Sequence, residues 1–177
     1  GELPGPRVLT SLRAISVSSE TPDELRSIVR ELHADGADVV KMFASASIRE
    51  GGVKLMSDQQ IRAVCHEANE LGLRTVVHAY GTESLTAIIE AGCEGIEHGN
   101  RYSDEVIALM AEHGTYLDPH LGLLYANYFD NREKYIGLGN YTEEGFALME
   151  EARVIGYETF RRTLVNGNVK IVYGTDA

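Results

Sequence analysis

The hydrophobic positions alternate between short apolar runs and longer stretches with helical periodicity. The runs at 73–77 and 95–97 are followed directly by His78 and His98. Between them, residues 82–91 repeat apolar side chains at helical spacing, with a glycine on each side, which predicts a helix between two strands. A strand, a helix and a second strand imply a right-handed parallel crossover, so both histidines should lie at the same edge of a sheet.

The same alternation continues in both directions from this unit. Thr21, Pro22 and Glu24 form a capping pattern at the start of a helix that should end near Gly36. The other predicted helices cover residues 57–72, 103–114 and 142–167, and the other predicted strands cover residues 38–43, 115–118 and 169–173.

Three segments fit this alternation less well. Residues 1–6 are rich in Gly and Pro and are predicted to be a loop, and residues 7–17 give only a weak strand. Residues 119–141 are predicted to be a long connection whose four tyrosines form a lid or a pocket wall. In the helix that follows, Gly156 predicts a break.

About six strands alternating with five helices, all parallel, predict an α/β fold. The expected architecture is a TIM-type (β/α)8 barrel that is only partly present, or an open doubly wound sheet. With no linker in the sequence, residues 1–177 are interpreted as one partial catalytic domain. The chain stops one residue after Asp176 and lacks an initiator Met, so we expect a fragment.

Composition and charge narrow the function. A formal net charge of −11 argues against nucleic acid and anionic membranes, because both require a basic surface. No apolar run approaches the roughly 20 residues that a membrane span needs. Cys65 and Cys93 are isolated in the sequence, which favours reduced thiols and a cytoplasmic protein. A small-molecule substrate is the expected partner.

Polar residues stand at the ends of four predicted strands: Lys41, His78, His98 and Asp176. A barrel would bring them to one mouth. Imidazole and carboxylate are the usual protein ligands of Zn²⁺ and related divalent ions. A free ammonium cannot bind a cation, but a neutral lysine amine can take up CO₂ to form a carbamate, whose oxygens can bridge two metals. Burial favours that neutral form by lowering the lysine pKa.

The motifs GADVVKMF, SDQQIRAVCHEANELGLRTVVHAYG, AGCEGIEHGN and YGTDA, in this order, resemble the metal-dependent amidohydrolase superfamily. The resemblance is to its branch of imidazolonepropionase-like and Xaa-Pro dipeptidase (prolidase-like) enzymes. It implies a carboxylated Lys41 on the fourth strand, metal-binding histidines on the fifth and sixth, and an aspartate on the eighth. The family's first-strand His-x-His pair does not occur in the sequence, so the chain should correspond to about strands 3 to 8.

The resemblance also implies a reaction. Amide-type C–N bonds of dipeptides or N-acyl amino acids would be hydrolysed by a metal-activated hydroxide, with one or two divalent ions, zinc foremost. Asp176 would be the catalytic acid–base. His120, Tyr80, Arg49 and Arg101 are candidate substrate contacts, because they fall in loops at the same mouth.

Other interpretations stay open at the level of sequence. Lys41 could form a Schiff base in a lyase or aldolase, or could be the buried partner of Glu97 or Asp118. Glu97 itself should face away from His98, because side chains alternate along a strand, and is interpreted as structural. An incomplete barrel could also be non-catalytic and associate through its edges as a homo-oligomer.

Overall fold

A single parallel sheet organises the computed structural model, which describes residues 5, 7–16 and 19–176. Most of the predicted loop at 1–6, and residue 17 of the weak strand, lie outside these described residues. Each strand pairs with the next strand in the chain, and every pair is parallel. The strands are β1 (Ala14–Ile15), β2 (Val39–Phe43), β3 (Arg74–Ala79), β4 (Gly95–His98), β5 (Tyr116–Asp118) and β6 (Lys170–Ile171).

This neighbour order decides between the two predicted architectures. In a doubly wound sheet the strand order reverses part-way, whereas in a (β/α) barrel each strand lies beside the strands before and after it in the chain. The observed order β1-β2-β3-β4-β5-β6 contains no reversal. The prediction of a partial barrel is therefore confirmed, and the doubly wound alternative is wrong.

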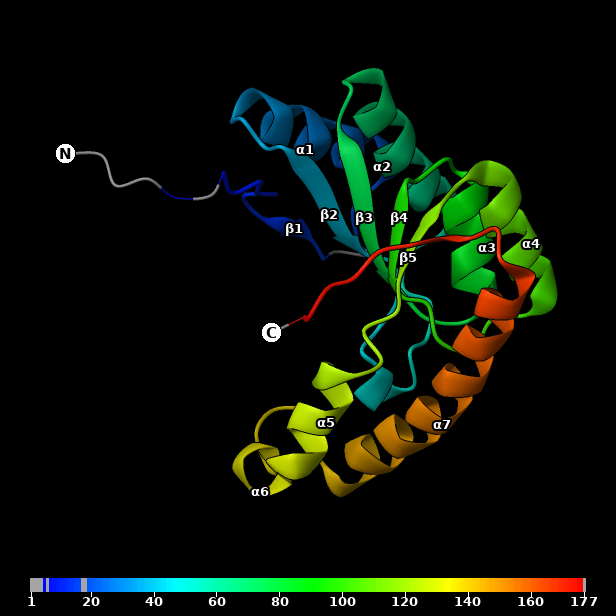
Figure 1. The fold of residues 1–177 in the computed structure, drawn as a ribbon. Coiled ribbons are helices and arrows are strands. Elements are labelled where there is room, and N and C mark those ends of the chain that lie inside the picture. Colours follow the sequence, from blue (N-terminus) through cyan, green and yellow to red (C-terminus); the bar gives the residue numbers. More distant parts are fainter. Residues whose placement is uncertain (1–4, 6, 17–18, 177) are drawn as a thin grey trace.

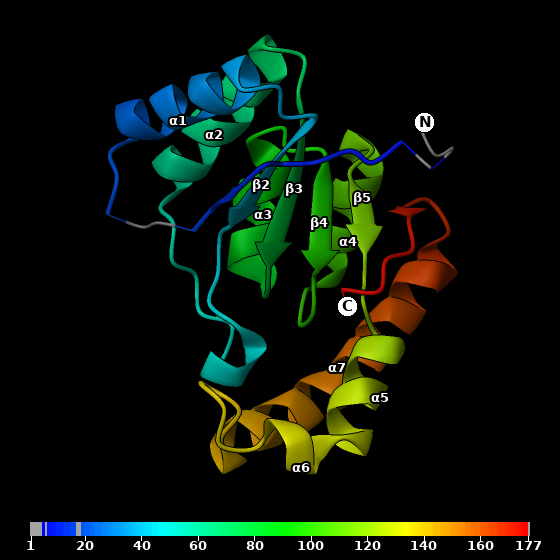
Figure 2. The same ribbon diagram turned by 90° about the vertical axis from the view of Figure 1, so that its left-hand side faces the viewer.

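Four helices cover one face of the sheet, and their bounds agree with the sequence periodicity. Figures 1 and 2 show this layer behind the strands. Thr21 with Glu24, and Ser57 with Gln60, form complete capping boxes at the first two helices, so their orphan backbone N–H groups are satisfied locally. The four helices are α1 (Pro22–Ala34), α2 (Asp58–Glu70), α3 (Thr82–Glu90) and α4 (Asp104–His113).

Side-chain alternation along the strands separates the two faces. Met42, Val77, Ile96 and Leu117 point toward the helices and are fully buried in the main core. The residues between them point to the opposite face, which the four helices leave uncovered (Figure 2). Lys41 belongs to this second set, so the strand pattern alone places it on the concave side of the sheet.

A second helical layer lies beyond the carboxyl ends of the strands (Figure 1). It contains η1 (Ile48–Glu50), α5 (Leu123–Asp130), α6 (Arg132–Tyr135) and α7 (Glu143–Asn166). The expectation that 119–141 has no regular structure is therefore wrong, because aromatic side chains of this segment pack with Phe146 and Met149 into a second apolar cluster. Its prediction as a pocket wall is confirmed for two of the four tyrosines, because Tyr125 and Tyr128 line a pocket at the carboxyl ends of the strands. Among the described helices, none combines the length and apolar composition needed to cross a membrane.

The predicted break at Gly156 is also wrong, because α7 runs through it without interruption. A β-carbon at this position would lie 2.5 Å from Asn100 Nδ2 and 2.9 Å from Leu121 Cδ2. The glycine is therefore needed for close packing of the helix against the β4–α4 and β5–α5 loops. The reason for a glycine at position 156 is thus steric, and Gly156 does not interrupt the hydrogen bonding of α7.

The two edge strands are shorter than predicted. Of the described residues 7–16 only two pair in the sheet, and of residues 169–173 only two do so. Apolar side chains that the pattern assigned to strands are instead exposed, including Val8 and Tyr173. Each edge strand has a single neighbour, which limits how far pairing extends.

The expectation of reduced cysteines is wrong. Cys65 in α2 and Cys93 in the turn before β4 form a disulfide, with a Cα–Cα distance of 5.2 Å. Both residues are buried. The separation of 28 residues does not predict this pairing. The two cysteines meet because α2 packs against α3. The cytoplasmic location stays a prediction.

Candidate active site

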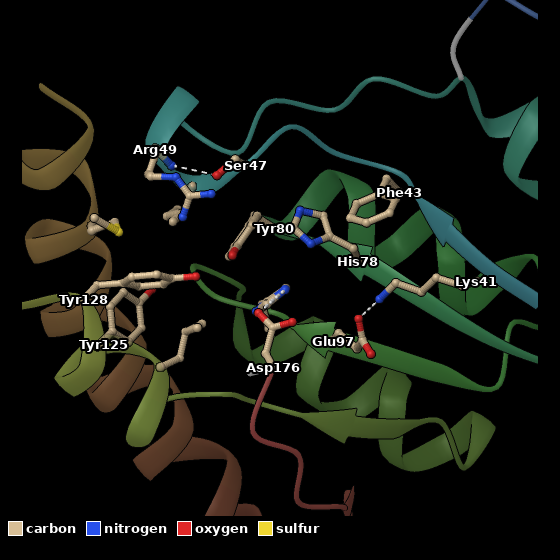
Figure 3. A pocket seen from close by; sticks show the side chains of 14 residues that line it. Lys41, Phe43, Ser47, Arg49, His78, Tyr80, Glu97, Tyr125, Tyr128 and Asp176 are labelled. Atoms are coloured by element: carbon tan, nitrogen blue, oxygen red, sulfur yellow. Dashed lines mark hydrogen bonds and ion pairs between the residues drawn. The ribbon is translucent and has the colours of Figure 1, made fainter. Parts of the chain in front are cut away.

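The carboxyl ends of the strands open into a pocket of about 260 Å³ (Figure 3). The structure brings all four predicted strand-end residues to this pocket, although they lie on four separate segments of the chain. Helices α5 and α7 and the short helix η1 form its other side. The lining consists of Lys41, Phe43, Ser47, Ile48, Arg49, His78, Tyr80, Glu97, His98, Leu124, Tyr125, Tyr128, Met149 and Asp176.

Lys41 projects from β2 toward the middle of this pocket and forms an ion pair with Glu97 of β4. Burial lowers the pKa of Lys41 to about 8, and the nearby carboxylates of Asp176 and Asp118 oppose this shift. The contact with Glu97 likewise favours the charged ammonium. Movement of Glu97 away from Lys41 would therefore increase the fraction of neutral amine.

The expectation that Glu97 faces away from His98 is wrong, because both side chains line the same pocket. The alternative in which Glu97 is the acidic partner of Lys41 is confirmed. Glu97 pairs with His78 in the β3–β4 register, so both side chains point to the concave face. His98 reaches the same pocket because its φ of +69° lies in the left-handed region, which interrupts the strand alternation. Consecutive residues of β4 therefore both contribute to the site.

The two strand-end histidines are buried neighbours. Their ring centroids lie 4.6 Å apart, and His78 Nε2 lies 3.4 Å from the carbonyl oxygen of Ala46. Burial lowers the pKa of His78 to about 4 and holds the pKa of His98 well below its usual range. At neutral pH both imidazoles are uncharged, so each has a ring nitrogen with a lone pair available for bonding.

Asp176 approaches this pair from the C-terminal segment after β6. Its Oδ2 atom lies 3.9 Å from His98 Nε2, and its side chain is 43% exposed. The φ of Asp176 is +53°. Just before it, Gly174 packs so closely that a β-carbon would lie 2.3 Å from Asp118 Oδ2 and 2.8 Å from His120 Cε1. Asp176 is therefore placed by close contact between this segment and the end of β5.

His120 lies behind His98, at a ring-centroid distance of 4.9 Å. Its Nδ1 atom is 3.6 Å from Asp118 Oδ1. Both ring nitrogens of His120, together with Asp118 Oδ1, are buried and have no hydrogen-bond partner among the described residues. Buried polar atoms in this state are costly unless another group binds them, which fits a position beside a ligand site.

Of the other predicted substrate contacts, Tyr80 and Arg49 line the pocket and Arg101 does not. Tyr80 lines the pocket and stacks on His98 at 5.1 Å between ring centroids, and burial raises its pKa well above the usual range. Arg49 also lines the pocket. Arg101 lies elsewhere, because its guanidinium forms an ion pair with Glu151 of α7 at 3.4 Å.

The side chains around His78 and His98 offer a partial set of donors for a divalent cation. Within the described part of the chain, no three His, Cys, Asp or Glu side chains stand close enough together to hold a metal ion. His78, His98 and a carbamate on Lys41 would supply three donors of the right chemistry, with Asp176 beside them. The residues therefore fit such a cation once Lys41 is carboxylated, because an ammonium cannot serve as a ligand.

The comparison with protein families identifies the fold. A sequence model of the amidohydrolase family matches residues 2–177. The chain belongs to this family. The resemblance seen in the sequence motifs is thus confirmed, and so is the kind of barrel to which the sheet belongs.

The chain spans less than half the length of the relatives that it matches. It is 34% identical over 112 residues to an uncharacterized protein of Mycobacterium bovis, covering 62% of this chain and 30% of the relative. Among solved structures, a Xaa-Pro dipeptidase with methionine bound in its active site gives a TM-score of 0.74 at 31% identity, over 89% of this chain and 39% of that one. A prolidase complexed with N-methylphosphonate-L-proline gives a TM-score of 0.77 at 26% identity, over 89% and 38%.

Several lining residues of the pocket are not predicted from the sequence. Glu97 was misplaced, and the apolar contributions of Leu124 and Met149 were not expected. A signal for Glu97 existed, because parallel pairing aligns His78, Glu97 and Asp118 in one row across β3, β4 and β5. No comparable signal pointed to Leu124 or Met149, which reach the pocket only through the packing of α5 and α7.

Proposed function

We propose that the protein containing this chain is a metal-dependent hydrolase of amide-type C–N bonds in small substrates. One observation carries the proposal: Lys41, His78, His98 and Asp176 come from four separate segments and meet in a single pocket. Family membership supports it, and the similarity to a Xaa-Pro dipeptidase and a prolidase favours dipeptides or N-acyl amino acids as substrates. The proposal concerns the whole protein, because this chain spans less than half the length of the relatives that it matches.

The residues of the pocket would have two roles in this hydrolysis, cation binding and proton transfer. Lys41, after release from Glu97 and uptake of CO₂, would hold a divalent cation together with His78 and His98. Such a cation lowers the pKa of a bound water and polarises a carbonyl. Asp176, beside His98, would accept a proton from the water and deliver it to the departing amine. Tyr80 and His120 remain candidate substrate contacts.

The first prediction separates metal binding from proton transfer. Asp176→Asn should keep most of the bound metal but lose about two to four orders of magnitude in kcat, the usual contribution of a general acid–base. Lys41→Gln should lose the metal itself. Metal content by elemental analysis, and turnover of dipeptide substrates, are the measurements, with Lys54→Gln as the control at a lysine whose partners, Asp58 and Glu83, lie at the surface.

Undiminished turnover in Asp176→Asn would refute the acid–base role. A mass increase of one CO₂ on Lys41, together with bound metal, would support the hydrolase. Trapping of a carbonyl compound on Lys41 by borohydride, without metal, would instead favour Schiff-base chemistry.

A further inference from the structure

Arg49 differs from the other arginines that stack on aromatic rings in the second helical layer. Arg132 lies 4.3 Å from the Phe146 ring and pairs with Glu143, and Arg153 lies over Phe129 and pairs with Glu150. Arg49 also stacks on aromatic rings, but within the described residues no carboxylate forms an ion pair with it. In a chain with a net charge of −11, acidic partners are abundant, so this unpaired cation needs an explanation.

The guanidinium of Arg49 is held in a fixed orientation. Its Nε atom donates a hydrogen bond of 2.7 Å to Asn140 Oδ1, and its central carbon lies 4.0 Å from the ring centroid of Tyr141 and 5.6 Å from that of Tyr128. Among the described residues, the two terminal Nη atoms have no hydrogen-bond partner. A rigid guanidinium with two unused donors suits two-point binding of a carboxylate.

Arg49 and His78 line the same pocket with Tyr80 between them, and the Lys41–Glu97 pair lies at the end farther from Arg49 (Figure 3). The lining of this pocket also includes apolar side chains, among them Leu124, Tyr125 and Met149. The volume of about 260 Å³ is at or below the usual lower limit for small-molecule pockets, roughly 300 Å³. The pocket therefore suits a short molecule with an apolar body and one anionic end.

We propose that Arg49 is the specificity-determining residue of this site and binds the free carboxylate of the substrate. Asn140 and Tyr141 act as positioning residues that hold its Nη atoms toward the pocket. The substrate class is then an amide whose leaving amine carries a carboxylate and a small apolar side chain, cleaved only at the carboxyl-terminal residue. The identity of the cleaved bond rests on the proposed function. The binding of a carboxylate by Arg49 does not depend on it.

Binding to the chelator-treated protein tests the proposal without turnover. Calorimetry should show that N-acetyl-L-leucine binds more tightly than N-acetyl-L-leucinamide, which lacks the charge. Arg49→Gln should weaken binding of the acid by roughly 30-fold, the order expected for a charged hydrogen bond, and leave binding of the amide unchanged. Arg132→Gln is the matched control, because it removes a stacked arginine that already has a carboxylate partner. Equal binding of acid and amide by the unsubstituted protein would overturn the proposal.

Two variants test the positioning residues. Asn140→Asp keeps the side-chain shape but gives Arg49 an internal carboxylate, so binding of the acid should fall while binding of the amide persists. Tyr141→Leu should weaken binding of the acid about fivefold through loss of stacking, and Tyr141→Phe should restore it. Acid binding unaffected by Asn140→Asp, in a protein with an unchanged melting temperature, would contradict the assigned role.

The outcomes separate this inference from the proposed function. Selective binding of the acid without any hydrolysis by the metal-loaded protein would leave the Arg49 assignment intact and refute the hydrolase. Hydrolysis at equal rates of substrates with and without a free carboxylate would support the hydrolase and refute the Arg49 assignment. Inorganic phosphate that competes as strongly as the acid would show a general anion site and overturn the carboxylate assignment.

Discussion

Several side chains around the pocket depend on unusual backbone conformations. His98, His120 and Asp176 all have positive φ, at +69°, +46° and +53°. Such values are uncommon for residues other than glycine, and they persist only where the surrounding structure imposes them. At this site they turn three polar side chains toward the carboxyl ends of the strands, which regular strand geometry would not do for His98.

The residue that limits the position of Asp176 is Gly174. Gly174→Ala should reduce turnover by about an order of magnitude or more, because its β-carbon would collide with Asp118 and His120 and displace Asp176 from His98. Turnover of dipeptide substrates and thermal melting are the measurements. Gly122→Ala is the control, since a β-carbon there meets no atom within 4 Å. Normal turnover in Gly174→Ala would show that the position of this segment is unimportant for activity.

Helix packing behind the sheet includes an ion-pair cluster that spans two elements. Glu67 on α2 is buried and accepts hydrogen bonds of 2.7 and 3.0 Å from Arg30 on α1, with Arg26 at 3.8 Å. The hydrogen bonds from Arg30 lower the pKa of Glu67, despite the opposing effect of burial. The contact therefore stabilises the pairing of α1 with α2 only while the carboxylate is ionised.

This cluster predicts a definite pH dependence. Because the folded-state pKa of Glu67 lies below the unfolded-state value of 4.5, its stabilisation is complete above that value and is lost as pH falls through the folded-state pKa. Glu67→Gln should thus lower the free energy of unfolding at pH 7 and converge with the unsubstituted protein in acid. Urea unfolding between pH 3 and pH 7 measures this. Glu90→Gln, at the exposed end of α3, is the control, and a pH-independent difference for Glu67→Gln would contradict the account.

At the scale of the whole molecule, two helical layers enclose the strands from different sides. The first layer packs against one face of the sheet, and the second closes the carboxyl ends (Figures 1 and 2). The pocket forms where the sheet meets the second layer, so strands contribute Lys41, His78 and Glu97, whereas α5 and α7 contribute Leu124 and Met149. This division explains how one pocket presents both reactive groups and an apolar surface.

The disulfide adds a covalent link within the first layer. In the chain-entropy description, joining Cys65 to Cys93 across 28 residues contributes about 3 to 4 kcal/mol to the free energy of unfolding. The double variant Cys65→Ala, Cys93→Ala should lose about this amount in denaturant unfolding. The reduced, unsubstituted protein is the control, since it keeps both sulfur atoms in the core. Equal free energies of unfolding for the oxidised and reduced forms would contradict a stabilising role of the disulfide.

The sequence alone determined the order of the elements and the strand-end chemistry. Capping residues and periodicity are local properties, so Thr21 and Ser57 marked helix starts and the apolar runs marked strands. The convergence of Lys41, His78 and His98 followed from parallel topology, which brings carboxyl ends together.

Only the tertiary structure decided which neighbours those residues have. The contact between Lys41 and Glu97, the reversal of His98 by its backbone, and the Cys65–Cys93 bond all join segments distant in sequence or depend on forces from them. The helices at 123–135 likewise form because aromatic side chains find partners on α7, and a local pattern of hydrophobic and polar residues contains no information about such partners.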